Sequence, residues 1–283
     1  MKIFNTIPKI REALREIRRD GMTIGFVPTM GFLHEGHLSL IRIAKRRADV
    51  VVVSIYVNPM QFSAGEDLAA YPRDFRRDET LCENEGVNFI FYPNDEEIYP
   101  DGFATRISVE GLKEPLCGRS RPSHFDGVAT VVAKLFNIVE PDLAVFGKKD
   151  FQQLAIIRRM TRDLDFPIEI VGGETVRERD GLAMSSRNKY LSPAEREVAP
   201  TLYRALRMAK QRIEDGGAED SEAVKRVMRA QIESADAFEI DYIEIVDPET
   251  LIPVANPSSR KVVIALAVRL GAARLIDNIE VGF

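Results

Sequence analysis

A nearly continuous apolar segment, Val50–Val57, constrains the fold of this chain more than any other feature. A strand with one face in solvent alternates apolar and polar residues, whereas this segment is apolar on both faces. Strands of that kind lie in the middle of parallel sheets, where helices cover both faces. We therefore expect a parallel sheet with Val50–Val57 near its centre.

Helix-like and strand-like patterns alternate from residue 5 to residue 171. Helices are expected at 5–20, 38–47, 75–85, 128–139 and around 154–160, and further strands at 23–27, 88–92, 142–146 and 168–171. In such an alternation each helix crosses over between two parallel strands. The pattern predicts an α/β fold, a Rossmann-like doubly wound parallel sheet, in a domain of residues 1–175.

The last third of the chain has a different pattern. Two helical stretches, 193–215 and 221–234, are followed by short strands at 238–245, 262–268 and 273–277. Helices followed by strands indicate a smaller α+β domain rather than further strand–helix–strand units. We assign residues 176–283 to this domain and expect it to close over the parallel sheet as a lid.

Two of the three histidines of the chain lie at one strand-to-helix turn, His34-Glu35-Gly36-His37. A helix N-terminus presents free N–H groups and a partial positive charge, which suit a phosphate. Gly36 lets a ligand approach the backbone closely. One histidine could instead cap the helix while the other packs against its neighbours, but two histidines at one such turn favour a functional pair.

Polar side chains follow two other predicted strands directly. They are Asn58 and Gln61 after Val50–Val57, and Lys149, Asp150 and Gln153 after the strand at 142–146. The C-terminal ends of parallel strands meet at one edge of the sheet, where ligands bind in open α/β folds. We therefore expect these groups to line one crevice together with the two histidines. Turn formation explains Asn58, which precedes Pro59, better than it explains Gln61.

Two later loops carry arginines. The loop at 116–127 contains Arg121 and His124, and its arginines could equally contact a phosphate or carboxylate or be surface charges. The loop at 175–188 contains Ser185-Ser186-Arg187, whose hydroxyl and guanidinium groups are suitable donors to a polyphosphate. Taken alone, Ser185-Ser186-Arg187 is weak evidence for a phosphate site, and its place after the last strand of the sheet strengthens that evidence.

Composition argues against several other classes of protein. The net charge of −5 gives no reason to expect a nucleic-acid surface. No apolar run is long enough to span a bilayer, and the N-terminus lacks the layout of a signal peptide. Cys82 and Cys117 form neither a metal motif nor a disulfide framework. We therefore expect a cytoplasmic protein without membrane or nucleic-acid partners.

Several segments resemble one known family. His34-Glu35-Gly36-His37 is similar to the HxGH signature of the nucleotidyltransferase superfamily that includes class I aminoacyl-tRNA synthetases. The longer segment 28–37 resembles the pantothenate synthetase (pantoate–β-alanine ligase) family, as do the segments 53–62, 121–128, 146–153 and 180–188. In the last of these, Ala183 and Ser186 stand where the synthetase KMSKS loop has lysines. Phe32, Tyr56 and Ser123 depart from the family pattern beside functional positions.

The resemblance implies a reaction. Pantoate and ATP would form pantoyl adenylate and pyrophosphate, and β-alanine would then displace AMP to give pantothenate. Such a reaction needs aligned substrates and stabilised phosphate charge more than covalent help from the protein. The family also suggests a homodimer and Mg²⁺ bound through the phosphates.

The resemblance also implies roles for individual residues. Those with catalytic roles are His37, His34, Lys149 and Arg187, with Ser185 and Ser186 helping to hold the β- and γ-phosphates. Those expected to line the nucleotide are Met30, Gly31, Gly147, Lys148, Asp150, Val176 and Met184. Those expected to contact pantoate or β-alanine are Gln61, Gln153, Asn58, Tyr71, Arg121 and His124. Asp78 and Asp150 are weaker candidates for contact with Mg²⁺.

Other functions are compatible with part of this pattern. A cytidylyltransferase or adenylyltransferase would use the same histidine turn, but its phosphate acceptor would favour arginine or lysine over Gln61 and Gln153. A regulatory nucleotide-binding module without turnover would not need His34, His37 and the cations together. The length and the acidic balance argue against a tRNA synthetase.

Overall fold

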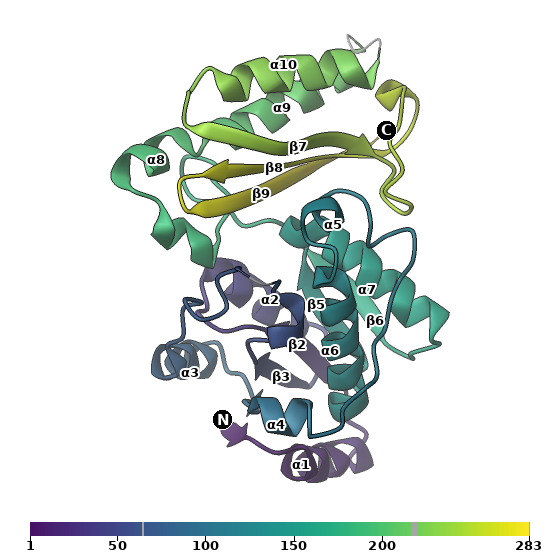
Figure 1. Ribbon diagram of the computed structural model, residues 1–283. Helices are drawn as coiled ribbons and strands as arrows, with labels where there is room; N and C mark the ends of the chain where they lie inside the picture. The colour runs from purple at the N-terminus through teal and green to yellow at the C-terminus, as the bar shows by residue number, and fades with distance from the viewer. Residues whose placement is uncertain (64, 217–219, 283) are drawn as a thin grey trace.

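The computed structural model describes residues 1–63, 65–216 and 220–282 of the chain. Two β-sheets lie one above the other in it (Figure 1). The lower sheet has six strands in the order β1-β4-β3-β2-β5-β6, and the paired strands are parallel. The upper sheet has three antiparallel strands in the order β7-β8-β9. This architecture confirms the predicted α/β fold with a smaller C-terminal α+β unit.

The strands of the two sheets have the following bounds. The lower sheet contains β1 (Lys2–Phe4), β2 (Ile24–Thr29), β3 (Val50–Ile55), β4 (Phe89–Phe91), β5 (Leu143–Gly147) and β6 (Glu169–Gly173). The upper sheet contains β7 (Phe238–Val246), β8 (Val262–Leu270) and β9 (Ala273–Val281). Every residue of β3 is buried, as its two-sided apolar sequence predicts.

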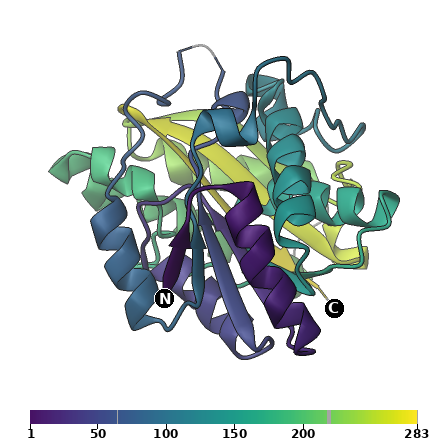
Figure 2. The same ribbon diagram turned by 90° about the horizontal axis from the view of Figure 1, so that it is seen from below.

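Helices cover both faces of the parallel sheet. Their bounds are α1 (Ile7–Arg19), α2 (Glu35–Lys45), α3 (Phe75–Asn84), α4 (Asp95–Ile98), α5 (Cys117–Ser120), α6 (His124–Val139) and α7 (Phe151–Asp163). One face of the sheet packs against α1, α6 and α7, and the other packs against α2 and α3. Figure 2 shows α3 and α6 on opposite sides of the strands.

The structure differs from the sequence predictions at several places. The predicted loop at 116–127 contains the short helix α5, the predicted helix at 193–215 is divided into two helices, 193–198 and 201–214, and the last strand runs to Val281. Strand β1 was not expected, because three residues are too few to show the alternation of apolar and polar residues that indicates a strand. The acidic stretch after β4 contains the short helix α4, because Asn94 caps it by accepting from the Glu97 N–H at 2.9 Å. Helix α6 begins at His124 rather than at residue 128, which places this histidine on a helix instead of in a loop.

Both faces of the C-terminal sheet are packed against other elements. Helices α8 (Pro193–Val198), α9 (Thr201–Glu214) and α10 (Ser221–Glu233) belong to this unit. Leu266 and its alternate neighbours on β8 pack with α9 and α10. Ala265 and Ala267 face the other way and join the same core as Leu116 and Cys117 of the lower unit. A continuous apolar contact therefore fixes the upper sheet against the lower unit.

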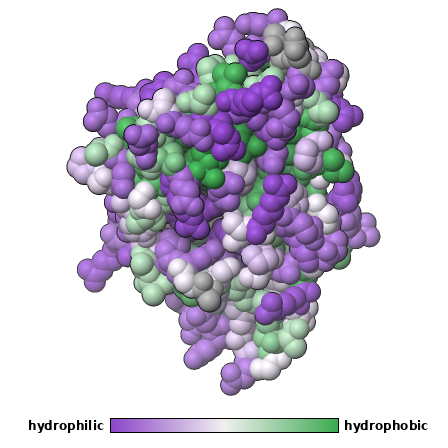
Figure 3. Space-filling view, turned by 45° about the horizontal axis from the view of Figure 1, so that its top comes forward, coloured by the Kyte–Doolittle hydropathy of each residue, from purple (hydrophilic) through white to green (hydrophobic). Residues whose placement is uncertain are grey.

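Hydrophilic residues cover most of the surface that Figure 3 shows, with hydrophobic residues between them. Large hydrophobic residues that are exposed include Met1, Leu164 and Ile252, which are far apart in the sequence. Across the part of the chain that the structure describes, no helix combines the length and apolar character needed to cross a membrane.

Candidate active site

The strand order changes direction at β2. The chain passes from β2 to β3 and β4 on one side, whereas β5 and β6 lie on the other side. Loops that leave the C-terminal ends of β2 and β5 therefore diverge and open a crevice. A cavity of about 220 Å³ lies at this point. Side chains from all three predicted groups line it, namely His34, His37, Asn58, Gln61, Lys149, Asp150 and Gln153.

The two histidines fix each other at the start of α2. His34 caps the helix, because its Nδ1 accepts the Gly36 N–H at 3.1 Å. Nδ1 of His37 accepts the His34 N–H at 3.3 Å, and the two ring centroids are 4.1 Å apart. A Cβ on Gly36 would lie 2.8 Å from Cε1 of His34, so this turn requires glycine. Capping and lining the cavity are thus compatible roles for His34.

These contacts assign the tautomer of both rings. Each Nδ1 is a hydrogen-bond acceptor, so each ring carries its proton on Nε2. Burial, reinforced by Lys149, lowers the pKa of His34 to about 4. Burial, followed by the neighbouring His34 and Lys149, lowers the pKa of His37 well below its usual value. Both rings are neutral at pH 7 and can offer an Nε2–H donor to a ligand.

Asn58 and Gln61 form a buried amide pair after β3. Nδ2 of Asn58 donates to Oε1 of Gln61 and to the Gly127 carbonyl, both at 3.1 Å. Oδ1 of Asn58 accepts from the Tyr99 hydroxyl at 2.8 Å. The amide of Asn58 is therefore hydrogen-bonded within the protein and holds Gln61 in place. Nε2 of Gln61 lies 3.0 Å from the Met30 sulfur.

The two glutamines at the start of α7 have different surroundings. Gln152 is buried, and its side chain accepts from the Cys117 N–H and donates to the Leu112 and Pro115 carbonyls. Within the part of the chain that the structure describes, the side chain of Gln153 has no hydrogen-bond partner, and it lines the cavity. Its donor and acceptor are therefore both available to a ligand.

The two lysines after β5 point to different places. Lys149 lines the cavity, and its Nζ lies 3.9 Å from Oδ2 of Asp150. Nζ of Lys148 instead contacts the carboxylates of Glu174 at 2.5 Å and Glu280 at 2.7 Å. Lys148 is absent from the cavity lining formed by the described residues, so the structure gives no support to the expectation that it contacts the nucleotide.

The segment after β6 closes one side of the cavity. It forms a short hairpin, in which Met184 N–H donates to the Val176 carbonyl at 3.0 Å. A 3₁₀ helix, η3 (Ser186–Tyr190), follows, and Ser185 caps it by accepting the Arg187 N–H at 3.2 Å. The residues of this segment that line the cavity include Val176, Met184, Ser185, Ser186 and Arg187.

Two acidic residues of one segment hold the arginines of the site. Arg187 forms a bidentate pair with Asp67, at 3.0 and 3.1 Å, beside the ring of Tyr71. Arg121 forms a bidentate pair with Glu66, with both distances 2.7 Å. No sequence pattern predicts these roles for Glu66 and Asp67, because the polar segment around them shows no spacing that indicates a site.

Two other polar side chains border this region. Nδ1 of His124 lies 2.8 Å from the Gln61 carbonyl, and burial, followed by Arg121, lowers the pKa of His124 to about 4. The Tyr71 hydroxyl lies 3.5 Å from Oγ of Ser186. Both residues line the cavity.

Asp78 has a structural position behind the histidine turn. Its carboxylate accepts the N–H groups of Phe32 and Leu33, both at 2.7 Å, and burial raises its pKa. Gly31 lies next to it with a φ of 80°, and a Cβ there would be 3.0 Å from Oδ2 of Asp78. Among the described residues, Gly31 and Asp78 line a separate cavity and not the one that contains the histidines.

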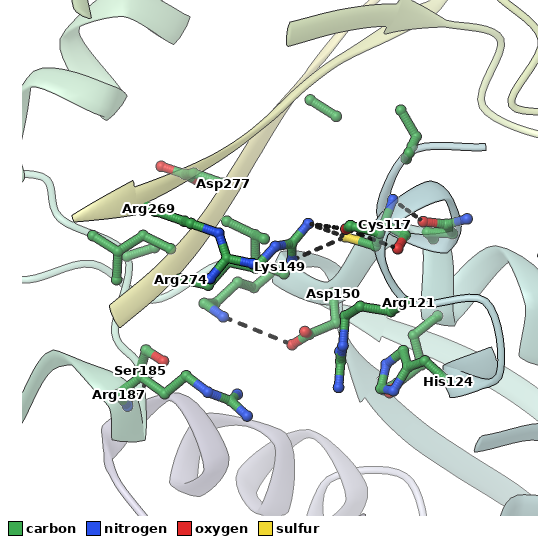
Figure 4. A pocket seen from close by; sticks show the side chains of 18 of the residues that line it. Cys117, Arg121, His124, Lys149, Asp150, Ser185, Arg187, Arg269, Arg274 and Asp277 are labelled. Atoms are coloured by element: carbon green, nitrogen blue, oxygen red, sulfur yellow. Dashed lines mark hydrogen bonds and ion pairs between the residues drawn. The ribbon is translucent and has the colours of Figure 1, made fainter. Parts of the chain in front are cut away.

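A second cavity, of about 490 Å³, lies between the two sheets and adjoins the first. Residues common to both linings include Arg121, His124, Lys149, Asp150, Gln153, Ser185 and Arg187. Figure 4 labels these residues, apart from Gln153, and shows them below the C-terminal sheet. Arg269 and Arg274, which belong to that sheet, face the same space. The larger space therefore gives access to the inner cavity from between the two units.

The fold and the site define a class of protein. A parallel α/β sheet with a His-x-Gly-His turn at its switch point, next to lysine and arginine side chains, is typical of enzymes of the HxGH nucleotidyltransferase type. The family model described as pantoate-beta-alanine ligase matches residues 2–280 of the chain.

Individual relatives agree with this match. The chain is 54% identical to a pantothenate synthetase from Caldicellulosiruptor bescii over 281 residues, which cover 99% of each chain. A crystal structure of pantothenate synthetase from Thermus thermophilus superposes with a TM-score of 0.94 at 48% identity and full coverage of both chains. A pantoate-beta-alanine ligase from Francisella tularensis, complexed with beta-gamma ATP and beta-alanine, has a TM-score of 0.82 at 34% identity, covering 99% of this chain and 97% of that one.

The chain belongs to the pantoate–β-alanine ligase family. It is a ligase that joins pantoate and β-alanine to form pantothenate.

Proposed function

We propose that the enzyme activates pantoate with ATP in the cavity at the switch point. A carboxylate oxygen of pantoate attacks the α-phosphorus of ATP, and the bond to the bridging oxygen breaks, which releases pyrophosphate and leaves pantoyl adenylate. The neutral amine of β-alanine then attacks the acyl carbon. AMP leaves with the acyl oxygen, and the nitrogen loses a proton to give pantothenate.

One observation carries this proposal. A single cavity contains the two neutral histidines of the turn, a lysine and two arginines beside two glutamine amides. The donors and cations suit charge that develops on phosphate oxygens. The amides suit a carboxylate that must remain nucleophilic, because a bidentate arginine would bind the ground state more tightly.

An assay of AMP release tests the proposal. With ATP, Mg²⁺ and pantoate, sustained AMP release should require β-alanine, and pantothenate should accumulate with the AMP. If no AMP forms with any pair of pantoate and amine, the acceptor is wrong, and the cytidylyltransferase or adenylyltransferase alternative becomes the better one.

We place pantoate between Gln61 and Gln153, with its hydroxyl and carboxylate groups on their amides. Gln153 has free hydrogen-bonding groups, and Gln61 is held in place by Asn58. Arg121, His124 and Tyr71 lie close enough to the same cavity to contact pantoate or β-alanine. The larger cavity between the sheets offers β-alanine its route to the acyl adenylate.

The variant Gln153→Ala should have a KM for pantoate raised by about tenfold, because two hydrogen bonds are lost at roughly 0.5–1.5 kcal/mol each. Its KM for ATP should change little. Gln211→Ala, an exposed glutamine on α9, is a matched control and should change neither constant. An unchanged KM for pantoate in Gln153→Ala would place pantoate elsewhere.

We place the β- and γ-phosphates on Lys149, Ser185, Ser186 and Arg187. The α-phosphate and the leaving pyrophosphate oxygen then face His34 and His37, whose Nε2–H groups stabilise the developing charge. We place the ribose and base against other residues of the cavity lining, namely Met30, Gly147, Val176 and Met184.

The ion pair between Asp67 and Arg187 competes with this arrangement. Asp67→Asn should lower the KM for ATP by about two- to fivefold, because a partly exposed ion pair is worth roughly 0.2–1 kcal/mol. Asp163→Asn removes an ion-paired carboxylate at the end of α7 and is the control. An unchanged or raised KM for ATP in Asp67→Asn would show that Asp67 does not compete with the phosphates.

We propose that Mg²⁺ enters with ATP and uses Asp150 as its protein ligand. The carboxylate of Asp150 is half-exposed and lines both cavities, so it fits an ion that keeps most of its water and phosphate ligands. The ion would neutralise charge on the phosphates. Among the described residues no group of three or more His, Cys, Asp or Glu is arranged to hold a metal, and the two oxygens of Asp78 accept backbone N–H groups.

We further propose that residues 1–175 form the nucleotide- and pantoate-binding domain and that residues 176–283 act as its lid. The parallel sheet ends with β6 at Gly173, and the antiparallel sheet with its helices lies after residue 176, which supports the division. On the family resemblance we propose a homodimer, which light scattering of the purified enzyme would test. The free, buried thiols of Cys82 and Cys117 support a reducing, cytoplasmic location.

A further inference from the structure

Two polar residues are buried side by side on β9, an edge strand of the C-terminal sheet. Asp277 is 4% exposed and Asn278 is 7% exposed. Their partners on β8 are Leu266 and Ala265, which belong to different cores, because consecutive side chains on a strand point to opposite faces. Buried polar groups need partners. One oxygen of Asp277 accepts the Asn278 N–H at 2.8 Å, and both side chains also have partners outside the C-terminal sheet.

Asn278 holds the backbone of the lysine turn. Its Nδ2 donates to the carbonyl of Lys148 at 3.0 Å and to that of Lys149 at 2.8 Å. These two carbonyls belong to η2 (Lys148–Asp150), the 3₁₀ turn between β5 and α7. A single amide of the upper sheet therefore fixes the main chain from which the Lys149 side chain extends into the site.

Asp277 holds the segment after β6. Its carboxylate accepts two hydrogen bonds from Arg177, at 2.6 and 2.9 Å. Arg177 also donates to the Gly181 carbonyl at 3.1 Å, and its guanidinium lies 3.7 Å from the ring centroid of Tyr203. Arg177 pairs with Ala183 in the hairpin that leads directly to Ser185.

We propose that Asp277 and Asn278 are positioning residues that set the distance between Lys149 and the Ser185–Arg187 segment. Two rigidly connected residues of β9 hold the two loops that would grip the triphosphate from either side. In Figure 4, Lys149 lies between the strand that carries Asp277 and the segment that carries Ser185 and Arg187. The C-terminal sheet is then part of the phosphate site as well as a cover for it. This inference rests on the proposed contacts of Lys149 and Ser185–Arg187 with ATP.

The variant Asn278→Leu tests the proposal, because leucine has the branched shape and the number of side-chain heavy atoms of asparagine and removes both N–H donors. Affinity for a non-hydrolysable ATP analogue should fall by about tenfold or more, since small displacements of a binding group are costly. Affinity for AMP should stay within about twofold, because AMP lacks the β- and γ-phosphates. Calorimetric titration of the purified enzyme with both ligands measures the ratio.

Asn88→Leu is the matched control. The Asn88 side chain also makes a hydrogen bond to the backbone, at 2.8 Å to the Val51 N–H, but beside the N-terminal end of β4. The ratio of the affinity for the ATP analogue to the affinity for AMP should be the same in Asn88→Leu as in the unmodified enzyme. If Asn278→Leu loses affinity for both ligands equally, Asn278 has only a structural role and the proposal fails. Should that variant not fold, Asn278→Ser retains one donor and should show a smaller drop in the same ratio.

The variant Lys149→Ala separates failure of this inference from failure of the proposed function. If Asn278 acts through Lys149, Asn278→Leu should weaken ATP binding little further in a Lys149→Ala background. If Lys149→Ala alone leaves ATP binding unchanged, the proposed phosphate contact of Lys149 is wrong and this inference falls with it. If Lys149→Ala weakens ATP binding while Asn278→Leu does not, only the positioning role is wrong.

Discussion

Replacing His37 with alanine should slow formation of the acyl adenylate by about 10²–10³-fold while ATP still binds. The ring is buried and neutral, and the His34 N–H occupies its Nδ1, so its contribution is an oriented Nε2–H donor. Loss of one such donor to developing charge costs about 10²–10³-fold in rate. Pantoate-dependent exchange of labelled pyrophosphate into ATP measures this step directly, and titration with an ATP analogue measures binding separately.

The pH dependence distinguishes a hydrogen-bond donor from a proton donor. Because the pKa of His37 is lowered well below its usual value, the neutral ring is the working form throughout the neutral range. The exchange rate should therefore not fall as the pH rises through about 6.5, the ordinary histidine pKa. A fall there that is absent from His37→Ala would assign His37 the role of acid.

Ser39→Ala is the control for the same helix. The Ser39 hydroxyl donates to the Gly36 carbonyl at 2.7 Å, so this variant perturbs α2 without removing a donor from the cavity. Its exchange rate should remain within a few-fold of that of the unmodified enzyme. Near-normal turnover in His37→Ala would refute the role that we assign to His37.

Local patterns were sufficient to predict the sheet and the crevice. The two-sided apolar sequence of Val50–Val57 and the alternation around it specify a parallel sheet, and a parallel sheet places its loops at one edge. The polar residues that follow strands directly, such as Gln61 and Lys149, were therefore predictable as neighbours. The histidine turn was predictable because the residues that define it are adjacent in the sequence.

Directions of side chains and contacts between distant segments were not predictable in this way. Lys148 and Lys149 are adjacent and chemically equal, and it is Lys148 that turns from the cavity, toward Glu174 and toward Glu280 on β9. Asn278 reaches a carbonyl 129 residues away, and Asp67 reaches an arginine 120 residues away. No spacing rule within one segment carries such information, because these pairs arise from the packing of the two units.

Close backbone packing under the proposed pantoate site is the basis of the second large expected effect. Gly127 on α6 lies against the turn that carries Gln61. A Cβ there would be 2.3 Å from the Met60 carbonyl oxygen and 2.6 Å from the Gln61 nitrogen. The Gly127 carbonyl also accepts one of the two hydrogen bonds that Nδ2 of Asn58 donates. Helix α6 and the amide pair are therefore held at a separation that only glycine permits.

Gly127→Ala should consequently lower the free energy of unfolding by about 2 kcal/mol or more, as overpacking of a close contact does, and raise the KM for pantoate by about tenfold. Chemical unfolding and steady-state kinetics measure the two effects. Asn137→Ala, at an exposed position of the same helix, should change the free energy of unfolding by no more than about 0.5 kcal/mol. Because the clash is with main-chain atoms, adding Met60→Ala should not rescue Gly127→Ala. Rescue by that smaller side chain would show that the contact is with the side chain of Met60, and the separation of α6 from the amide pair would then not depend on glycine.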